Sequence, residues 1–161
     1  MANPFPFSSG DILTAANLNS IGEWTSFTPD INKVSDYGTG AVRAGIYATF
    51  NELCVIMFAV TFGTSPTFDT GNWKMDLPVA SDTATHSLGN LGSAIVRIYA
   101  DSNGNRQYYL SGDIGDGTTD AFTFRTGVQG SVGGNLQRDN IYTIAATDRI
   151  HGIALYPIAA S

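Results

Sequence analysis

The chain has few of the residues on which most enzymes and metalloproteins depend. Its 161 residues include 1 cysteine, Cys54, and 2 histidines. A single cysteine excludes an internal disulfide and a cysteine-based zinc site. Cys54 lies inside an apolar run, which predicts a buried, unreactive thiol, because reactivity requires exposure and an electropositive setting. Phosphate-binding, dinucleotide-binding, serine-nucleophile and zinc-protease motifs are also missing, so we expect neither an enzyme nor a cofactor.

Charged residues are scarce as well. They make up 14% of the chain, whereas about a quarter is usual. The 8 Lys and Arg residues against 14 Asp and Glu residues give a net charge of −6. The arginines are scattered along the sequence, whereas phosphate recognition needs clustered basic side chains. We therefore expect neither nucleic acid nor an anionic membrane surface as a partner.

Long hydrophobic runs are absent too. No stretch approaches the ~18–20 consecutive apolar residues of a membrane-spanning helix. The N-terminus lacks the basic region followed by an apolar core that marks a signal peptide. We expect a protein that is made in the cytoplasm and is not exported.

What the sequence does contain is the pattern of an all-β protein. Short apolar or alternating segments are separated by turns rich in glycine, asparagine and proline, and Asn103-Gly104 marks the clearest hairpin. The pattern predicts one domain over residues 30–161, a jelly-roll-like antiparallel β-sandwich. We expect about eight strands, at residues 42–50, 53–62, 72–77, 93–100, 106–111, 121–125, 141–147 and 151–158.

The segment 53–62 differs from an ordinary surface strand because both of its faces are apolar. A strand of this kind is covered on both sides. Either a neighbouring subunit or a loop or arm of the same chain could supply the second cover. The segment 153–158 is similarly apolar. The subunit-interface candidates are therefore Leu53, Val55, Met57 and Tyr156.

Residues 1–29 read as an attachment arm with one short helix. Prolines at positions 4 and 6 disfavour regular structure there. Thr14 is a suitable helix N-cap and Gly22 a suitable stop, but a helix this short needs a docking surface to be stable. The side chains expected to attach the arm are Leu13, Leu18, Ile21 and Trp24.

The histidines and tyrosines give weaker signals. His86 lies in a polar segment that predicts a solvated loop. His151 begins a closing strand, where it is expected at a rim or an interface. Tyr108 and Tyr109 are adjacent on a predicted strand, so one should face the core and the other should face out.

A cluster of carboxylates, Asp113, Asp116 and Asp120, occupies a segment predicted to be a loop. Their mutual repulsion could be relieved by Ca²⁺, which takes six to eight oxygen ligands. Aspartate and glycine also favour ordinary turns on backbone grounds. We prefer the turn interpretation and keep the calcium site as its alternative.

The segment SGDILTAANLNSIGEWTSFTPDI, with Leu77-Pro78-Val79 after a later strand, resembles small structural proteins of tailed bacteriophages. The matching elements are Leu13-Thr14-Ala15-Ala16, Leu18-Asn19, Trp24 and Thr28-Pro29. These proteins are described as tail-fibre-like, minor tail or virion surface proteins. The resemblance covers the first thirty residues and extends to the rest of the chain only by layout.

The resemblance implies a homotrimer on a virion, made in the host cytoplasm and anchored to other virion proteins through the arm. We expect a tail-fibre-type appendage for host adhesion, with a host surface glycan as a further partner. The first alternative is a capsid decoration or head-fibre protein. The second alternative is a glycan-binding module or a depolymerase.

Overall fold

The computed structural model describes residues 22–50, 52–82, 92–114, 121–126, 134–135 and 144–159. These residues form an all-β fold with antiparallel strands in a sandwich-like arrangement, as predicted from the sequence. The one helical element among them is a short 3-10 turn, η1 (Asp101–Asn103). No helix of the described chain is long and apolar enough to cross a bilayer.

The strands vary from two to nine residues in length. Their bounds are β1 (Thr25–Phe27), β2 (Val34–Asp36), β3 (Val42–Phe50), β4 (Leu53–Thr61), β5 (Thr67–Phe68), β6 (Lys74–Asp76), β7 (Gly92–Ala100), β8 (Arg106–Ile114), β9 (Ala121–Thr126), β10 (Gly134–Asn135) and β11 (Arg149–Pro157).

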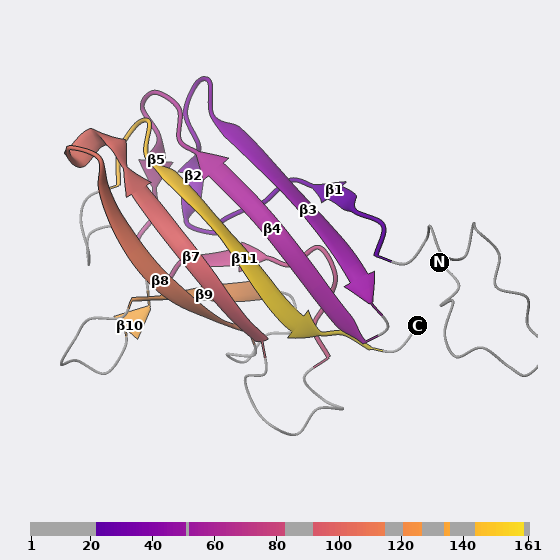
Figure 1. Cartoon of the computed structure of the whole chain (residues 1–161). Coiled ribbons are helices and arrows are strands. Elements are labelled where there is room, and N and C mark those ends of the chain that lie inside the picture. The colour runs from indigo at the N-terminus through magenta and orange to yellow at the C-terminus, as the bar shows by residue number, and fades with distance from the viewer. Residues whose placement is uncertain are drawn as a thin grey trace, which may run out of the picture.

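The described strands form one large sheet and one small one. The large sheet has nine strands in the order β1-β3-β4-β11-β7-β8-β9-β10, with β6 paired to β9, and β2 pairs with β5 in the small sheet. Figure 1 shows that β6 and β9 run behind the long strands, so the large sheet curls back over itself. We call β1, β3, β4, β11, β7 and β8 the front layer; the other strands lie behind it.

The hydrophobic core fills the space between the front layer and the strands behind it. Along β4 the burial alternates, with Cys54, Ile56, Phe58 and Val60 turned inward. Trp73, Met75 and Phe124 come from the rear and are fully buried. Each large side chain buried in this way contributes roughly 1.5–3 kcal/mol. The fold is therefore held by one core on a single side of the front layer.

Most of the expected strands are present. The segments 42–50 and 53–62 correspond to β3 and β4, and the best hairpin corresponds to β7 and β8. At the tip of this hairpin the positive φ angles belong to Gly104 and Asn105, with values of 66° and 62°. Gly104 was expected there, and the turn extends one residue further along the chain than Asn-Gly alone implies.

Two expectations about the positions of strands and loops were wrong. β8 continues to Ile114, so Asp113 lies in a strand and not in a loop. The described part of the expected strand 141–147 is a turn, in which Thr147 has a φ of 69°. The turn forms because the Asp148 carboxylate accepts a hydrogen bond from the backbone N–H of Ala145, which bends the chain. A local side-chain bond of this kind competes with a strand ladder.

Part of the predicted arm belongs to the sheet. Residues 25–27 form β1, which pairs with β3 and places Ser26 opposite Ile46. Three of the predicted attachment residues, Leu13, Leu18 and Ile21, lie outside the described residues. Pro157 is the last residue of β11, which lies between β4 and β7 in the sheet.

Candidate functional site

Much of the face of the front layer that is turned away from the core is apolar. The register places Ile46 opposite Met57, Met57 opposite Ile153, and Ile153 opposite Ile95. Residues that are paired across a sheet share a face, so these four form an apolar row across β3, β4, β11 and β7. In Figure 1 this face is turned toward the viewer, and no strand crosses in front of it.

The side chains on this face are large and exposed. Met57 is 45% exposed, Ile153 38% and Ile95 69%. We define the outer apolar face by its exposed large side chains, which are Val42, Ile46, Phe50, Leu53, Met57, Ile95, Ile153 and Leu155.

A contiguous apolar surface spread over four strands is unusual for a protein that works alone. Scattered exposed apolar residues need no explanation, but large patches mark sites of interaction. The outer apolar face is open and broad, which fits a macromolecular surface better than it fits a small molecule. It is the strongest candidate for a functional site in the described chain.

The predicted interface residues fall on both sides of the front layer. Leu53, Val55 and Met57 lie on the outer side, with Val55 half-buried. Tyr156, predicted as an interface residue, instead lies in the core, where its hydroxyl donates a hydrogen bond to the carbonyl oxygen of Val79. The prediction failed for Tyr156 because β11 is apolar on both faces, so the sequence does not show which face is covered.

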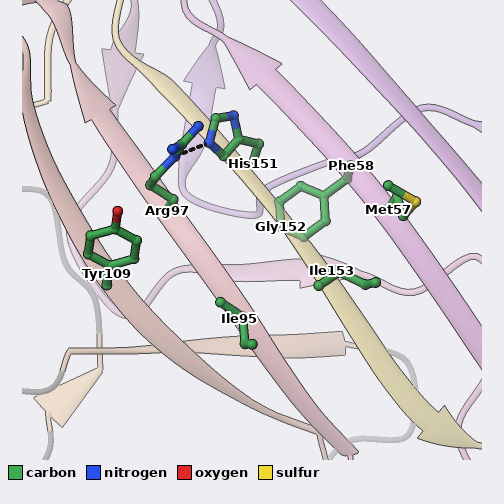
Figure 2. A pocket seen from close by; sticks show the side chains of 8 residues that line it. All are labelled: Met57, Phe58, Ile95, Arg97, Tyr109, His151, Gly152 and Ile153. Carbon is green, nitrogen blue, oxygen red and sulfur yellow. Dashed lines mark hydrogen bonds between the residues drawn. The ribbon is translucent and has the colours of Figure 1, made fainter.

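At one end of the outer apolar face is a hollow of about 500 Å³, drawn in Figure 2. Its floor and one side are apolar, and the other side is polar. The lining residues are Met57, Phe58, Ile95, Arg97, Tyr109, His151, Gly152 and Ile153.

The polar side of the hollow is built from three adjacent strands. His151 on β11 is opposite Arg97 on β7, and Arg97 is opposite Tyr109 on β8. Arg97 donates from Nε to His151 Nε2 over 2.5 Å, as the dashed line in Figure 2 shows. The Tyr109 hydroxyl donates to Gln107 Oε1 over 3.2 Å, and Arg97 Nη1 lies 3.5 Å from that same oxygen. The neighbouring side chains thus orient the guanidinium without neutralising it.

His151 is uncharged in this arrangement. Its Nε2 accepts a hydrogen bond, so that nitrogen carries no proton. Burial lowers the pKa of His151, and the positive charges of Arg97 and Arg149 lower it further. Neither Arg97 nor His151 forms an ion pair with any carboxylate of the described chain. Arg97 is therefore a cation that has no counter-charge among the described residues, and it lies at the end of an apolar surface.

A second hollow, of about 650 Å³, lies nearer the β1 edge of the front layer, between β1, β3 and β4. It also contains an arginine, Arg43. This arginine is satisfied, because Nη1 lies 2.9 Å from Asp30 Oδ1 and the guanidinium lies 4.4 Å from the ring centre of Tyr37. The contrast marks Arg97, and not Arg43, as the arginine that is available to a partner.

Two further residues, near the β1 edge of the front layer, have no partner among the residues that the structure describes. Trp24 immediately precedes β1 and is 48% exposed. Glu23 is exposed and forms no ion pair or hydrogen bond within the described chain. Trp24 was predicted from the sequence as an attachment residue. Glu23 and Arg97 were missed, because an isolated charged residue gives no signal in a single sequence.

The remaining sequence candidates supply no recognisable chemistry. Cys54 is buried, and burial raises the pKa of its thiol. Asp113 lies on β8, whereas Asp116, Asp120 and His86 lie outside the described residues. Among the residues that are described, no three histidine, cysteine or carboxylate side chains gather closely enough to hold a metal ion.

Tyr108 and Tyr109 behave as their adjacent positions predict. Tyr108 packs against the core, and Tyr109 is 69% exposed beside the hollow.

Comparison of the chain with protein-family models, with curated proteins and with solved structures gives no match in any of the three.

Proposed function

We propose that the protein is a non-enzymatic structural protein that assembles with copies of itself through the outer apolar face. In this proposal the assembly is a homotrimer on the surface of a bacteriophage particle, and its role is that of a tail-fibre-type appendage for host adhesion. The observation that carries the self-assembly is the row of exposed apolar residues from Ile46 to Ile95.

Physical chemistry favours covering this face. Each Å² of apolar surface removed from water contributes about 25 cal/mol, and homo-oligomer interfaces are the most apolar class of protein interface. Other copies of the chain are present wherever the chain is made, so covering the face by self-assembly requires no other protein. The low content of charged residues over the whole chain also suits a surface that is partly covered by subunits.

The phage assignment has separate support. It comes from the resemblance of Leu13-Thr14-Ala15-Ala16, Leu18-Asn19, Trp24 and Thr28-Pro29 to small tailed-phage structural proteins. The same resemblance implies the trimer and the attachment of residues 1–29 to other virion proteins.

Capsid decoration is the second candidate. It is favoured by the compact form of the described residues, which show no extended shaft between an anchor and a tip. Labelling intact particles with a gold-conjugated antibody separates the two candidates. Label at the tail tip supports host adhesion, a regular array over the head supports decoration, and absence from purified particles contradicts both.

The self-assembly is tested by sedimentation velocity of the full chain. We expect a species near three times the chain mass of 17.1 kDa. Replacing Met57 and Ile153 together by Asp should give monomers, because it places two charges in the middle of the outer apolar face. Ser35→Asp, at an exposed position on β2, is the matched control and should leave the trimer intact. A monomeric wild-type chain at all concentrations would overturn the proposal.

A further inference from the structure

Arg97 carries a positive charge at the edge of the outer apolar face, and a purely apolar partner would supply no negative charge to pair with it. We propose that the hollow around Arg97 receives Glu23 and Trp24 of a neighbouring copy of this chain. The indole of Trp24 would pack on the apolar side of the hollow, and the Glu23 carboxylate would pair with the guanidinium. This inference rests on the proposed self-assembly and specifies which surfaces meet.

The hollow has the chemistry for such an occupant. Met57, Ile95 and Ile153 provide an apolar wall, and Arg97 stands beside it. His151 occupies Nε of Arg97 and Gln107 makes one long contact to Nη1, so the guanidinium keeps its other terminal N–H groups for a carboxylate. At about 500 Å³ the hollow is in the range of pockets that bury a group as large as an aromatic side chain.

Glu23 and Trp24 are the complementary pair. They are adjacent in sequence, so a carboxylate and a large aromatic ring leave the backbone within one residue of each other. Trp24 is about half-exposed, and Glu23 has no partner within the described residues. Tryptophan and arginine are the residues most enriched at the energetic centres of protein interfaces.

The pairing cannot form within one chain. Trp24 precedes β1, and Arg97 lies on β7, four steps along the strand order β1-β3-β4-β11-β7. Neighbouring strands lie about 4.8 Å apart, so the two sites are separated by about 19 Å across the sheet. A tryptophan side chain does not span that distance, and the contact must therefore link two copies.

The same geometry favours a ring over a face-to-face dimer. In a two-fold dimer the outer apolar face would meet itself. Among the outward residues of the described front-layer strands the carboxylate is that of Asp113 on β8, which is opposite Ser93. Asp113 already has an interaction partner within the chain, so a two-fold dimer offers Arg97 no free carboxylate. A contact between the β1 edge of one copy and the hollow of the next is heterologous, and closure of such contacts gives a cyclic assembly such as a trimer.

A charge swap tests the pairing. The variants Glu23→Arg and Arg97→Glu should each raise the dissociation constant of the assembly about tenfold or more, because each leaves two like charges in contact. The double variant restores opposite charges and should bring the constant back toward the wild-type value. Asp69→Arg, which reverses an exposed carboxylate behind the front layer, is the control and should have no such effect.

Trp24→Ala is the second measurement, and it should also weaken the assembly about tenfold or more. All of these positions are at least partly exposed, so thermal unfolding should confirm that each variant is folded. A double variant no tighter than either single variant, or an unchanged assembly in Trp24→Ala, overturns the inference. If the variant with Asp at both Met57 and Ile153 still gives monomers in that case, the outer apolar face is the interface but another part of the neighbouring chain covers it.

Discussion

Arg97 Nε donates a hydrogen bond to His151 Nε2 across the β7–β11 pair, between residues 54 positions apart in the sequence. The bond joins the guanidinium of Arg97, which is always charged, to the imidazole of His151, which accepts the bond only in its neutral form. It holds the guanidinium at the edge of the outer apolar face and leaves the positive charge uncompensated. Protonation of His151 removes the acceptor and places two cations side by side.

Stability should therefore fall in mildly acidic solution. The pKa of His151 in the folded protein is lowered from the ordinary value of 6.5 by burial and by its arginine neighbours. Below pH 6.5 the unfolded chain then binds more protons at this site than the folded chain does. Stability is retained above about pH 6.5 and is lost as the pH falls through the lower, folded-state pKa. Urea unfolding midpoints measured at several pH values report this loss.

The matched variant for this prediction is His151→Gln, which keeps an acceptor for Arg97 but does not titrate. The urea midpoint of this variant should fall less than that of the wild type as the pH is lowered from 7. His86 is present in both proteins, so its contribution cancels in the comparison. Identical pH profiles for the two proteins would show that His151 has no lowered pKa in the folded state.

The assignment of the two faces of β11 predicts opposite results for two isoleucines three positions apart. Ile150 is buried and Ile153 lies on the outer apolar face. Ile150→Ala should cost about 2–4 kcal/mol of unfolding free energy, from lost transfer energy and the cavity left behind. Ile153→Ala should cost less than about 1 kcal/mol. Both are best measured at protein concentrations low enough to dissociate the assembly, which removes assembly from the comparison. Similar losses at the two positions would contradict the assignment.

Asp148 fastens the tip of the β7–β8 hairpin to the turn before β11. Its buried carboxylate accepts hydrogen bonds from the backbone N–H and the hydroxyl of Ser102, both over 3.0 Å, and from the N–H of Ala145 over 2.8 Å. Asp148→Ala leaves these donors without their acceptor and should destabilise the fold by about 2–5 kcal/mol. Ser102→Ala removes one of the bonds and should cost about 1 kcal/mol. Equal losses in the two variants would show that the carboxylate contributes no more than the single hydroxyl bond.

Two glycines should respond to the same substitution to different degrees. Gly104→Ala meets no atom within 4 Å, so its cost of about 1 kcal/mol comes from the positive φ of 66° alone. At Gly63 an added Cβ would collide with the backbone of Gly38 and Thr39, which must shift, at a cost above about 2 kcal/mol. Differential scanning calorimetry should give the lower melting temperature for Gly63→Ala. The reverse order would mean that the loop at Gly63 yields easily.

Much of the fold could be predicted from the sequence, because strand formation and turn chemistry depend on near neighbours. The alternation in residues 42–50 and the Gly104 turn are local signals, and both appear in the structure as expected. The turn at Ala145–Asp148 could not be predicted in the same way. The buried carboxylate of Asp148 also binds Ser102, and that contact exists only once the hairpin has folded.

The candidate site was predicted in part. Leu53, Val55 and Met57 stood out because their segment is apolar on both faces, and they do lie on the outer side of the front layer. Arg97 gave no signal, since the role proposed for it depends on His151 from a distant strand and on the lack of an ion pair with any described carboxylate. Tyr156 was placed on the wrong side because its neighbours alternate between two equally apolar faces.

The sequence by itself determined that this chain forms antiparallel strands with tight turns, because period-two patterning and glycine at positive φ act over a few residues. It also determined that two segments, 53–62 and 153–158, are apolar on both faces. Only the tertiary structure decided which face is buried. The sheet curls so that β6 and β9 cover one side of β4, β11 and β7, and a strand with two apolar faces has no local preference between them. The packing of distant segments decides which face is buried, and it leaves Ile46, Met57, Ile153 and Ile95 facing outward.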